Sequence, residues 1–240
     1  MERIILIETS TALCSAALAE NGEITAYRES SAPKAHASLT AVFIQEMLQE
    51  RSLELSDCDA VCISMGPGSY TGLRVGTSTA KGLCFGSGKP LVAVGTLDTL
   101  VAQADESSIS AIDLKDVRYI VPMIDARRME VYTAVWERNE KGEWEQRTET
   151  SPMIIEEESF SEFLEQGKVL FIGDGAGKCA EVIKHPDAHF VQCWPKASSM
   201  LNPALKAYKE KRFEDVAYFE PFYLKEFVAT VSRKNLLQKS

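Results

Sequence analysis

Residues 64–83, "SMGPGSYTGLRVGTSTAKGL", join an apolar run to a segment with helical spacing. Three glycines around Pro67 predict a strand-to-helix turn, in which backbone N–H groups can converge on an anion. The nucleotide fingerprint GxxxxGK[ST] is absent, and Lys81 lies too far along the predicted helix to reach back to phosphates. Glycines can also serve only to let the backbone fold tightly. The turn by itself therefore predicts a strand-to-helix connection but does not establish that it binds an anion.

The helix predicted over residues 70–86 carries small residues at every fourth position, namely Gly72, Gly76 and Ala80. This spacing makes a smooth ridge that another helix can approach closely. Apolar residues of the preceding predicted helix, 36–51, spread wider than one buried stripe requires. We therefore predict that one face of this helix pair is left for a partner protein; the alternative is that the lobe itself covers both faces. The predicted interface residues are His36, Leu39, Thr40, Phe43, Met47, Tyr70, Leu73, Arg74, Gly76, Thr77, Ala80 and Lys81.

The bulk composition fits a globular chain of two lobes. The 240 residues are 45% hydrophobic and 25% charged, with a formal net charge of −9. This charge repels phosphate backbones, so we expect no direct binding of nucleic acid by the isolated chain. The six cysteines form no CxxC pair, which favours free thiols in a reducing compartment. No apolar window approaches the ~20 residues of a membrane span, so we expect a cytosolic protein.

Two similar runs of strands and helices follow one another along the chain. In the first half, strands are predicted at 3–8, 13–19, 23–29, 59–65 and 90–94; the Asn21-Gly22 pair marks a hairpin between the second and third. In the second half, strands are predicted at 118–124, 129–137, 143–149, 168–173 and 189–194, with helices at 157–166, 176–184 and 198–211. The order favours an α/β protein with two lobes of βββαβα type, each with a mixed sheet. We place the lobes at residues 1–105 and 106–240, with the last ~20 residues able to pack back on the first lobe.

Glu8 ends the first predicted strand and is followed by Thr9, Ser10 and Thr11. Together with Gly68 of the glycine turn, Glu8, Ser10 and Thr11 form a candidate nucleotide or metal corner, which we call the Glu8 corner. The other interpretation is a hairpin start with satisfied hydroxyls. No second carboxylate accompanies Glu8, which favours the structural interpretation, and we predict neither a metal site nor a resident cofactor.

Two segments of the second half also resemble functional motifs. "FIGDGAGKCAEVI" (171–183) fails as a Walker motif because Ile172 stands at the first glycine position and Cys179 replaces Ser or Thr. "IDARRMEVY" (124–132) places Asp125, Arg127 and Arg128 in a turn between two strands. We predict a structural or interlobe role for this turn, in which Asp125 pairs with one of the arginines. No Ser-His-Asp or Cys-His set is evident, so no catalytic residue is predicted.

Six motifs in chain order resemble those of the bacterial TsaB (YeaZ) family: "ILIETST", "KAHAS", "GPGSYTGLRVG", "IDARRMEVY", "FIGDGA" and "EPFYLKE". The resemblance covers essentially the whole chain, and the third and fourth motifs are the most specific. It implies an actin-like (ASKHA) fold. It also implies a non-catalytic subunit of the machinery that makes threonylcarbamoyladenosine beside the tRNA anticodon, in which the related TsaD subunit performs the transfer and the TsaE ATPase joins the pair.

The resemblance implies that the helices at 36–51 and 70–86 bind the TsaD-like subunit, and that they can pair two copies of this chain in its absence. Transfer RNA would then be bound only through the complex. Two features depart from the family pattern: Glu8 stands where Asp is more usual, and the first lobe has no helical HxxxH, since His36 is its only histidine. The alternative function is an active actin-like ATPase or small-molecule kinase that uses Glu8, Ser10, Thr11 and the "GDGAGK" turn.

Overall fold

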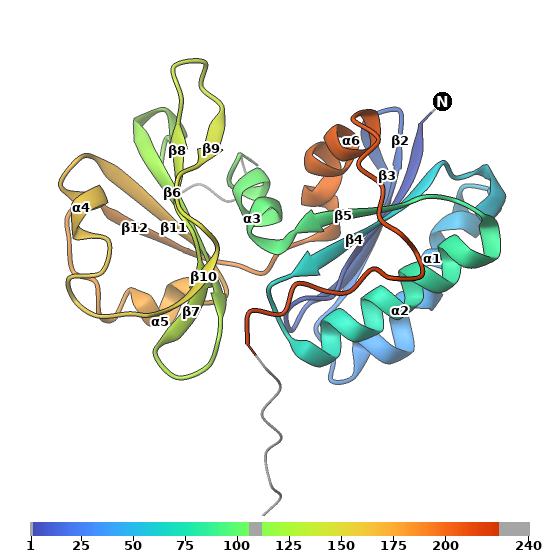
Figure 1. The fold of residues 1–240 in the computed structure, drawn as a ribbon, viewed down its shortest axis with the longest axis horizontal. Helices are drawn as coiled ribbons and strands as arrows, with labels where there is room; N and C mark the ends of the chain where they lie inside the picture. Colours follow the sequence, from blue (N-terminus) through green and yellow to red (C-terminus); the bar gives the residue numbers. More distant parts are fainter. Residues whose placement is uncertain (1, 106–111, 226–240) are drawn as a thin grey trace, which may run out of the picture.

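The computed structural model describes residues 2–105 and 112–225. Two lobes, each built around a β-sheet, lie side by side with helix α3 (Thr96–Ala104) between them (Figure 1). Strands β4 and β5 of the first sheet point towards the second lobe, so the carboxyl ends of these strands lie near the boundary between the lobes. The predicted two-lobed arrangement of mixed sheets is present.

The first sheet has the strand order β3-β2-β1-β4-β5. Its strands are β1 (Arg3–Glu8), β2 (Cys14–Glu20), β3 (Glu23–Ser30), β4 (Ala60–Gly66) and β5 (Leu91–Gly95). The first three are antiparallel and the remaining pairs are parallel. Asn21 and Gly22 both have positive φ, as a two-residue hairpin turn requires, so the predicted hairpin is confirmed.

Different helices cover the two faces of this sheet. Helices α1 (Ala35–Glu50) and α2 (Tyr70–Ser87) bury their apolar side chains against the face that carries Ile5 and Ile7. The opposite face, with Ile4 and Leu6, is covered by the short 3-10 helix η3 (Ala197–Met200) and by α6 (Leu201–Lys209). The alternation along β1 explains this arrangement, because successive side chains of a strand point to opposite faces. Both faces of the sheet are thus buried.

The second sheet has the main order β10-β7-β6-β11-β12, and β8 and β9 extend from β6. Its strands are β6 (Val117–Asp125), β7 (Glu130–Thr133), β8 (Trp136–Arg138), β9 (Trp144–Gln146), β10 (Ser151–Ile154), β11 (Lys168–Gly173) and β12 (Ala188–Gln192). Helix α3 buries Leu97, Leu100 and Val101 against one face. The other face is covered by the cluster that includes α4 (Ser161–Leu164) and α5 (Ala176–Cys179).

The second lobe differs from the prediction in one strand and two helices, and it contains β10, which was not predicted. The predicted strand 129–137 is divided, because residues 134 and 135 separate β7, which pairs with β6 and β10, from β8, which pairs with β9. The predicted helices at 157–166 and 176–184 shorten to the four-residue helices α4 and α5. The apolar residues of both predicted helices have helical spacing in the sequence. In the structure, the residues that flank α4 and α5 form turns, and their apolar side chains still reach the core.

The lobe boundary predicted at residues 105 and 106 is wrong for the end of the chain. Helices η3 and α6 belong to the core of the first lobe, although they follow the whole second sheet in the sequence. The segment 213–225, which we call the strap, then continues over the first lobe (Figure 1). Phe219 is buried in its core, and the Phe222 N–H donates to the Met65 carbonyl at 2.7 Å. Residues 226–240, most of the predicted returning segment, lie outside the described residues.

Two further sequence expectations concern cysteines and membranes. Cys14, Cys58, Cys62, Cys84 and Cys179 are buried free thiols, as predicted. In the part of the chain that the structure describes, we find no helix with the length and apolar character that a bilayer crossing demands.

Candidate functional site

The structure brings the residues of the Glu8 corner together at the end of β1. Glu8 and Ser10 are 0% exposed and Thr11 is 5% exposed. The Ser69 N–H, at the start of α2, donates to the Ser10 carbonyl at 2.6 Å. A Cβ placed on Gly68 would overlap this same carbonyl. The glycine turn therefore lies directly on the corner and separates it from solvent.

The polar atoms of the corner are only partly satisfied. The Ser10 N–H donates to Glu8 Oε1 at 2.6 Å. Within the described residues, five other buried oxygens have no hydrogen-bond partner: Glu8 Oε2, Thr9 Oγ1, Ser10 Oγ, Thr11 Oγ1 and Thr77 Oγ1. Burial raises the pKa of the Glu8 carboxyl, and the polar surroundings that Ser10 provides offset part of this effect. Carboxylate and hydroxyl oxygens can bind a metal ion or hydrogen-bond to a phosphate. Here, however, these oxygens are closed off from solvent.

An actin-like corner would hold a nucleotide and its metal, and the residues present here do not fit that role. The carboxylate and hydroxyls are buried under the start of α2, and the backbone of the glycine turn packs directly on the Ser10 carbonyl. No group of three or more His, Cys, Asp or Glu residues in ranges 2–105 and 112–225 could hold a metal ion. A ligand could enter this corner only if the start of α2 moved away from β1.

Most of the predicted interface residues point into the first lobe. Those that are buried are Thr40, Phe43, Met47, Leu73, Gly76, Thr77 and Ala80. The predicted outward ridge of Gly72, Gly76 and Ala80 is wrong. A Cβ on Gly76 would overlap Thr9 Oγ1 and lie 2.9 Å from Ile63 Cδ1, and a Cβ on Gly72 would overlap the Thr9 carbonyl. The residues of the ridge are small because α2 packs closely on its own sheet. This agrees with the alternative prediction, in which the lobe itself covers this face of the helix.

The other predicted interface residues contact their own chain. His36 Nε2 lies 2.8 Å from the Thr11 carbonyl oxygen, and Leu39 packs partly buried against the core. Arg74 stacks over the Tyr70 ring at 4.1 Å, and the Tyr70 and Tyr223 rings are 5.1 Å apart.

The strap also contacts Lys81. Lys81 Nζ donates to the carbonyls of Ala217 and Phe219 at 3.0 and 3.1 Å. The strap thus covers part of the surface that was predicted for a partner.

The exposed face of the α1–α2 pair consists of other residues. Val42 is 40% exposed and Phe85 is 87% exposed. A Cβ on Gly82 or Gly86 would meet nothing within 4 Å. A groove of about 270 Å³ lies beside this surface and is lined by Ala41, Ile44, Gln45, Leu48, Gln49, Leu53, Glu54, Leu55 and Leu83. The four-residue spacing of Gly82 and Gly86 could have been found in the sequence, but it competed there with the Gly72 series.

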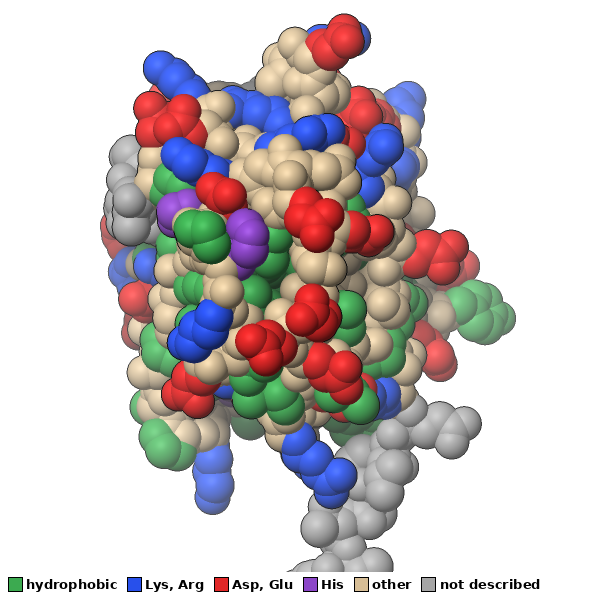
Figure 2. Space-filling model, turned by 90° about the vertical axis from the view of Figure 1, so that its left-hand side faces the viewer, with side chains coloured by type: hydrophobic (Ala, Val, Ile, Leu, Met, Phe, Trp, Pro, Cys, Tyr) green, Lys and Arg blue, Asp and Glu red, His purple; other side chains and the backbone are tan. Residues whose placement is uncertain are grey.

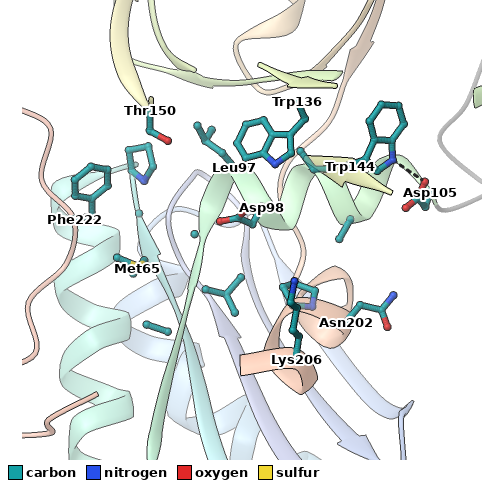
Figure 3. A pocket seen from close by; sticks show the side chains of 18 of the residues that line it. Met65, Leu97, Asp98, Asp105, Trp136, Trp144, Thr150, Asn202, Lys206 and Phe222 are labelled. Atoms are coloured by element: carbon teal, nitrogen blue, oxygen red, sulfur yellow. Dashed lines mark hydrogen bonds between the residues drawn. The ribbon is translucent and has the colours of Figure 1, made fainter. Parts of the chain in front are cut away.

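A larger cavity, of about 810 Å³, lies between the lobes (Figure 3). Trp136 and Trp144 reach it from the second lobe, Asp98 from α3 and Lys206 from α6. Loss of solvent around Asp98 raises the pKa of its carboxyl, while the positive charges of Arg212 and Lys206 oppose this effect. This cavity was not predicted, since its walls come from segments that are remote in the sequence.

In the turn after β6, Asp125 pairs with a lysine and not, as was predicted, with one of the neighbouring arginines. Lys178 Nζ lies 2.5 Å from Asp125 Oδ1 and also donates to the carbonyls of Arg128 and Glu130 at 2.8 and 2.7 Å. Asp125 also accepts the Arg127 N–H, and its own N–H donates to Asp174 Oδ1 at 2.8 Å. The prediction that Asp125 pairs with an Arg side chain is therefore wrong, because Lys178 already occupies it.

Replacement of Asp174 by asparagine is expected to stabilise the protein at neutral pH. Burial, with the nearby charge of Asp125, raises the pKa of Asp174 from 3.8 to about 6. The folded state therefore holds this proton more tightly than the unfolded state, so the free energy of unfolding falls as pH rises from about 4 to about 6 and stays lower above that. The asparagine side chain would keep the acceptor for the Asp125 N–H without the charge. We expect a gain of about 1 kcal/mol, or roughly 2–4 °C in Tm.

The measurement is a pair of thermal melts, at pH 7.5 and at pH 4. The gain should appear only at pH 7.5, whereas the control Asp116→Asn, which removes an exposed carboxylate and its ion pair with Lys168, should show no gain at either pH. A gain of equal size at both pH values would contradict an ionisation effect.

Comparison with known proteins agrees with this architecture. Residues 28–232 match the family model described as TsaD: tRNA N6-adenosine threonylcarbamoyltransferase. The chain is 30% identical over 235 residues to the tRNA threonylcarbamoyladenosine biosynthesis protein TsaB of Escherichia coli (strain K12), covering 95% of this chain and 96% of that protein. It is 32% identical over 230 residues to TsaB of Haemophilus influenzae (strain ATCC 51907 / DSM 11121 / KW20 / Rd), covering 94% of each.

The solved structure of YeaZ from Pseudomonas aeruginosa is similar to this one with a TM-score of 0.79 and 25% identity, over 93% of this chain and 100% of that chain. The two-lobed actin-like fold expected from the sequence is thereby confirmed. Full-length identity to curated relatives, the structural likeness and the order of motifs agree: the chain belongs to the TsaB family of tRNA threonylcarbamoyladenosine biosynthesis proteins.

Proposed function

We propose that the protein is a non-catalytic subunit that binds a TsaD-type transferase and supports the N6-threonylcarbamoylation of the adenosine beside the tRNA anticodon. The observation that carries this proposal is the sealed Glu8 corner. Its carboxylate is 0% exposed and lies beneath the start of α2, in a fold whose active members bind nucleotide at this place. A chain that keeps the fold but buries these polar groups is suited to binding a partner rather than to catalysis.

The partner surface that we propose is the outer face of α1 and α2. Exposed Val42 and Phe85 lie on this face, beside the groove that Ala41 and Leu83 line. Gly82 would allow close approach of a second helix. The family model that matches this chain describes a transferase, so the two proteins share a fold and can present equivalent helices to each other. Without the transferase, the same face can pair two copies of this chain.

The remaining components follow from this arrangement. A TsaE-type ATPase would join the pair, and the whole assembly would work in the cytosol. Because the chain has a formal net charge of −9, tRNA would bind to the complex and not to this subunit alone. An ATPase or kinase activity of the isolated chain, the alternative from the sequence, is disfavoured because Glu8 and Ser10 have no contact with solvent.

The test is reconstitution with a TsaD-type transferase and a TsaE-type ATPase. Tritiated threonine incorporated into tRNA would be measured with and without this chain, and ATP hydrolysis would be measured on the chain alone. We expect incorporation to depend on the chain and ATP turnover by the chain alone to stay at background. Turnover that Glu8→Ala abolishes, or full incorporation without the chain, would contradict the proposal.

A further inference from the structure

The turn between β6 and β7 has an unusual backbone. Arg127 and Arg128 both have positive φ, at 69° and 50°. The left-handed region costs a residue with a side chain roughly 1 kcal/mol or more, and here two consecutive arginines adopt it. Glycine or asparagine would relieve this cost. Such strain persists only where surrounding contacts impose it, and it is often found at functional sites.

Those contacts are present, and they hold the backbone rather than the arginine side chains. Asp125 Oδ1 accepts the Arg127 N–H at 2.7 Å. Lys178 Nζ donates to the Arg128 carbonyl at 2.8 Å, and its ion pair with Asp125 neutralises that carboxylate. The Glu130 N–H donates to the Arg127 carbonyl at 3.2 Å and closes the turn. The turn is thus fixed from within, and its two guanidinium groups take no part in fixing it.

Both guanidinium groups are exposed and form no ion pair, side-chain hydrogen bond or ring contact with any residue in 2–105 and 112–225. They differ in this from the other arginines of the same ranges, each of which contacts an acidic side chain, a carbonyl or an aromatic ring. Those arginines are Arg3, Arg28, Arg51, Arg74, Arg118, Arg138, Arg147 and Arg212. Unpaired arginines are notable in a chain that carries a net charge of −9.

Two acidic residues of the turn are paired with lysines. Asp125 pairs with Lys178, and Glu130 pairs with Lys225 of the strap. Asp174, which accepts the Asp125 N–H at 2.8 Å, adds one negative charge, so the two arginines still leave positive charge in local excess around this turn. Figure 2 views the molecule from the side of the second lobe. Basic side chains protrude at the lower edge of this face, the level at which β7 lies in Figure 1, and a group of acidic side chains lies above them.

We propose that Arg127 and Arg128 contact phosphates of the tRNA backbone when the chain is part of its complex. The planar guanidinium group matches phosphate oxygens with two parallel hydrogen bonds, and a rigid turn loses little entropy when it makes them. Two contacts are too few to overcome the net negative charge of the isolated chain. They add to binding once the transferase holds the tRNA, so this inference rests on the proposed function.

The test uses the reconstituted complex of this chain with a TsaD-type transferase. Affinity for tRNA would be measured over a range of salt concentrations for wild type and for Arg127→Gln/Arg128→Gln. Glutamine is shorter than arginine, but it keeps a polar, unbranched side chain and the left-handed backbone cost, and it removes the charge. We expect tRNA affinity at physiological salt to fall about tenfold, and the slope of log affinity against log salt to fall by about 2, near one unit for each lost phosphate contact.

Lys115→Gln/Lys141→Gln is the matched control, because it removes the same charge from exposed side chains of the same lobe. Lys141 lies in the β8–β9 hairpin, at the opposite end of the second lobe from β7 (Figure 1). The control should keep the wild-type slope. If the salt slope fell equally in both variants, the loss of net charge alone would explain it, and the proposed contacts would be contradicted. An unchanged slope for the arginine variant would also overturn the proposal.

Two further measurements separate the possible failures. Titration of the transferase with each variant should give wild-type affinity; if wild type itself does not bind the transferase, the proposed function fails rather than this inference alone. Binding of radiolabelled ATP to the isolated chain would also be measured. Binding that depends on Arg127 and Arg128, with tRNA affinity unchanged, would assign the turn to a nucleotide and overturn its assignment to RNA.

Discussion

Gly76→Leu is expected to destabilise the free protein severely, by at least about 3 kcal/mol, with a fall in Tm of roughly 10 °C or loss of folding. Even a single Cβ on Gly76 would overlap Thr9 Oγ1 and lie 2.9 Å from Ile63 Cδ1. Thr9 is fully buried at the end of β1, and Ile63 is fully buried in β4, so neither side chain can turn into solvent. Three more carbons could be placed only if α2 moved away from the sheet.

Thermal and urea melts of purified Gly76→Leu and Gly76→Ala would measure this effect. The alanine variant should lose less than the leucine variant, because its single methyl group can be accommodated by a small shift of α2. A Gly76→Leu protein with the wild-type melting temperature would show that α2 does not pack on β1 as the structure has it. It would also restore the sequence-based prediction of an outward ridge.

The sequence predicted the first lobe well because local signals there agree with one another. The five strands and the helices α1 and α2 lie within one or two residues of their predicted ranges. Asn21-Gly22 has the backbone that its hairpin requires, and β2, the strand before it, buries nearly all of its side chains. Strong turn chemistry and consistent periodicity reinforce each other in this lobe.

The direction of the small-residue ridge could not be predicted, since spacing identifies a helix face but not what covers it. Gly72, Gly76 and Ala80 share one face, while Gly82 and Gly86 share another. Both series have the four-residue period that permits close packing. Only the positions of β1 and β4 show that the first series lies against the sheet.

Contacts between distant segments were the other limit. The carboxylate of Asp125 pairs with Lys178, 53 positions away, and no local pattern favours that partner over the adjacent arginines. The interlobe cavity likewise joins Asp98, Trp136 and Lys206, which three separate elements supply. The return of η3 and α6 to the first sheet was missed for the same reason, because chain order suggested that they belong to the second lobe.

Gly82→Leu is expected to leave the free protein folded and to weaken its binding to a TsaD-type transferase about 5- to 150-fold, the equivalent of roughly 1–3 kcal/mol of overpacking. Gly82 lies in the same helix as Gly76, but a Cβ there meets nothing within 4 Å. Replacing a glycine inside a helix also reduces the entropy lost on folding, so Tm should stay the same or rise slightly. If a partner helix packs over Gly82, the leucine side chain must push it away.

Isothermal titration of the transferase with wild type, Gly82→Leu and Gln146→Leu would measure this effect, with a thermal melt of each. Gln146→Leu adds the same side chain to an exposed position on β9, outside the proposed surface, and should bind like wild type. Together with Gly76→Leu, the set separates the two faces of α2: one substitution should lower stability, and the other should lower affinity alone. If Gly82→Leu bound the transferase with wild-type affinity, the transferase would not bind at this face of α2, because a leucine at the centre of a close helix contact cannot be accommodated without loss of packing.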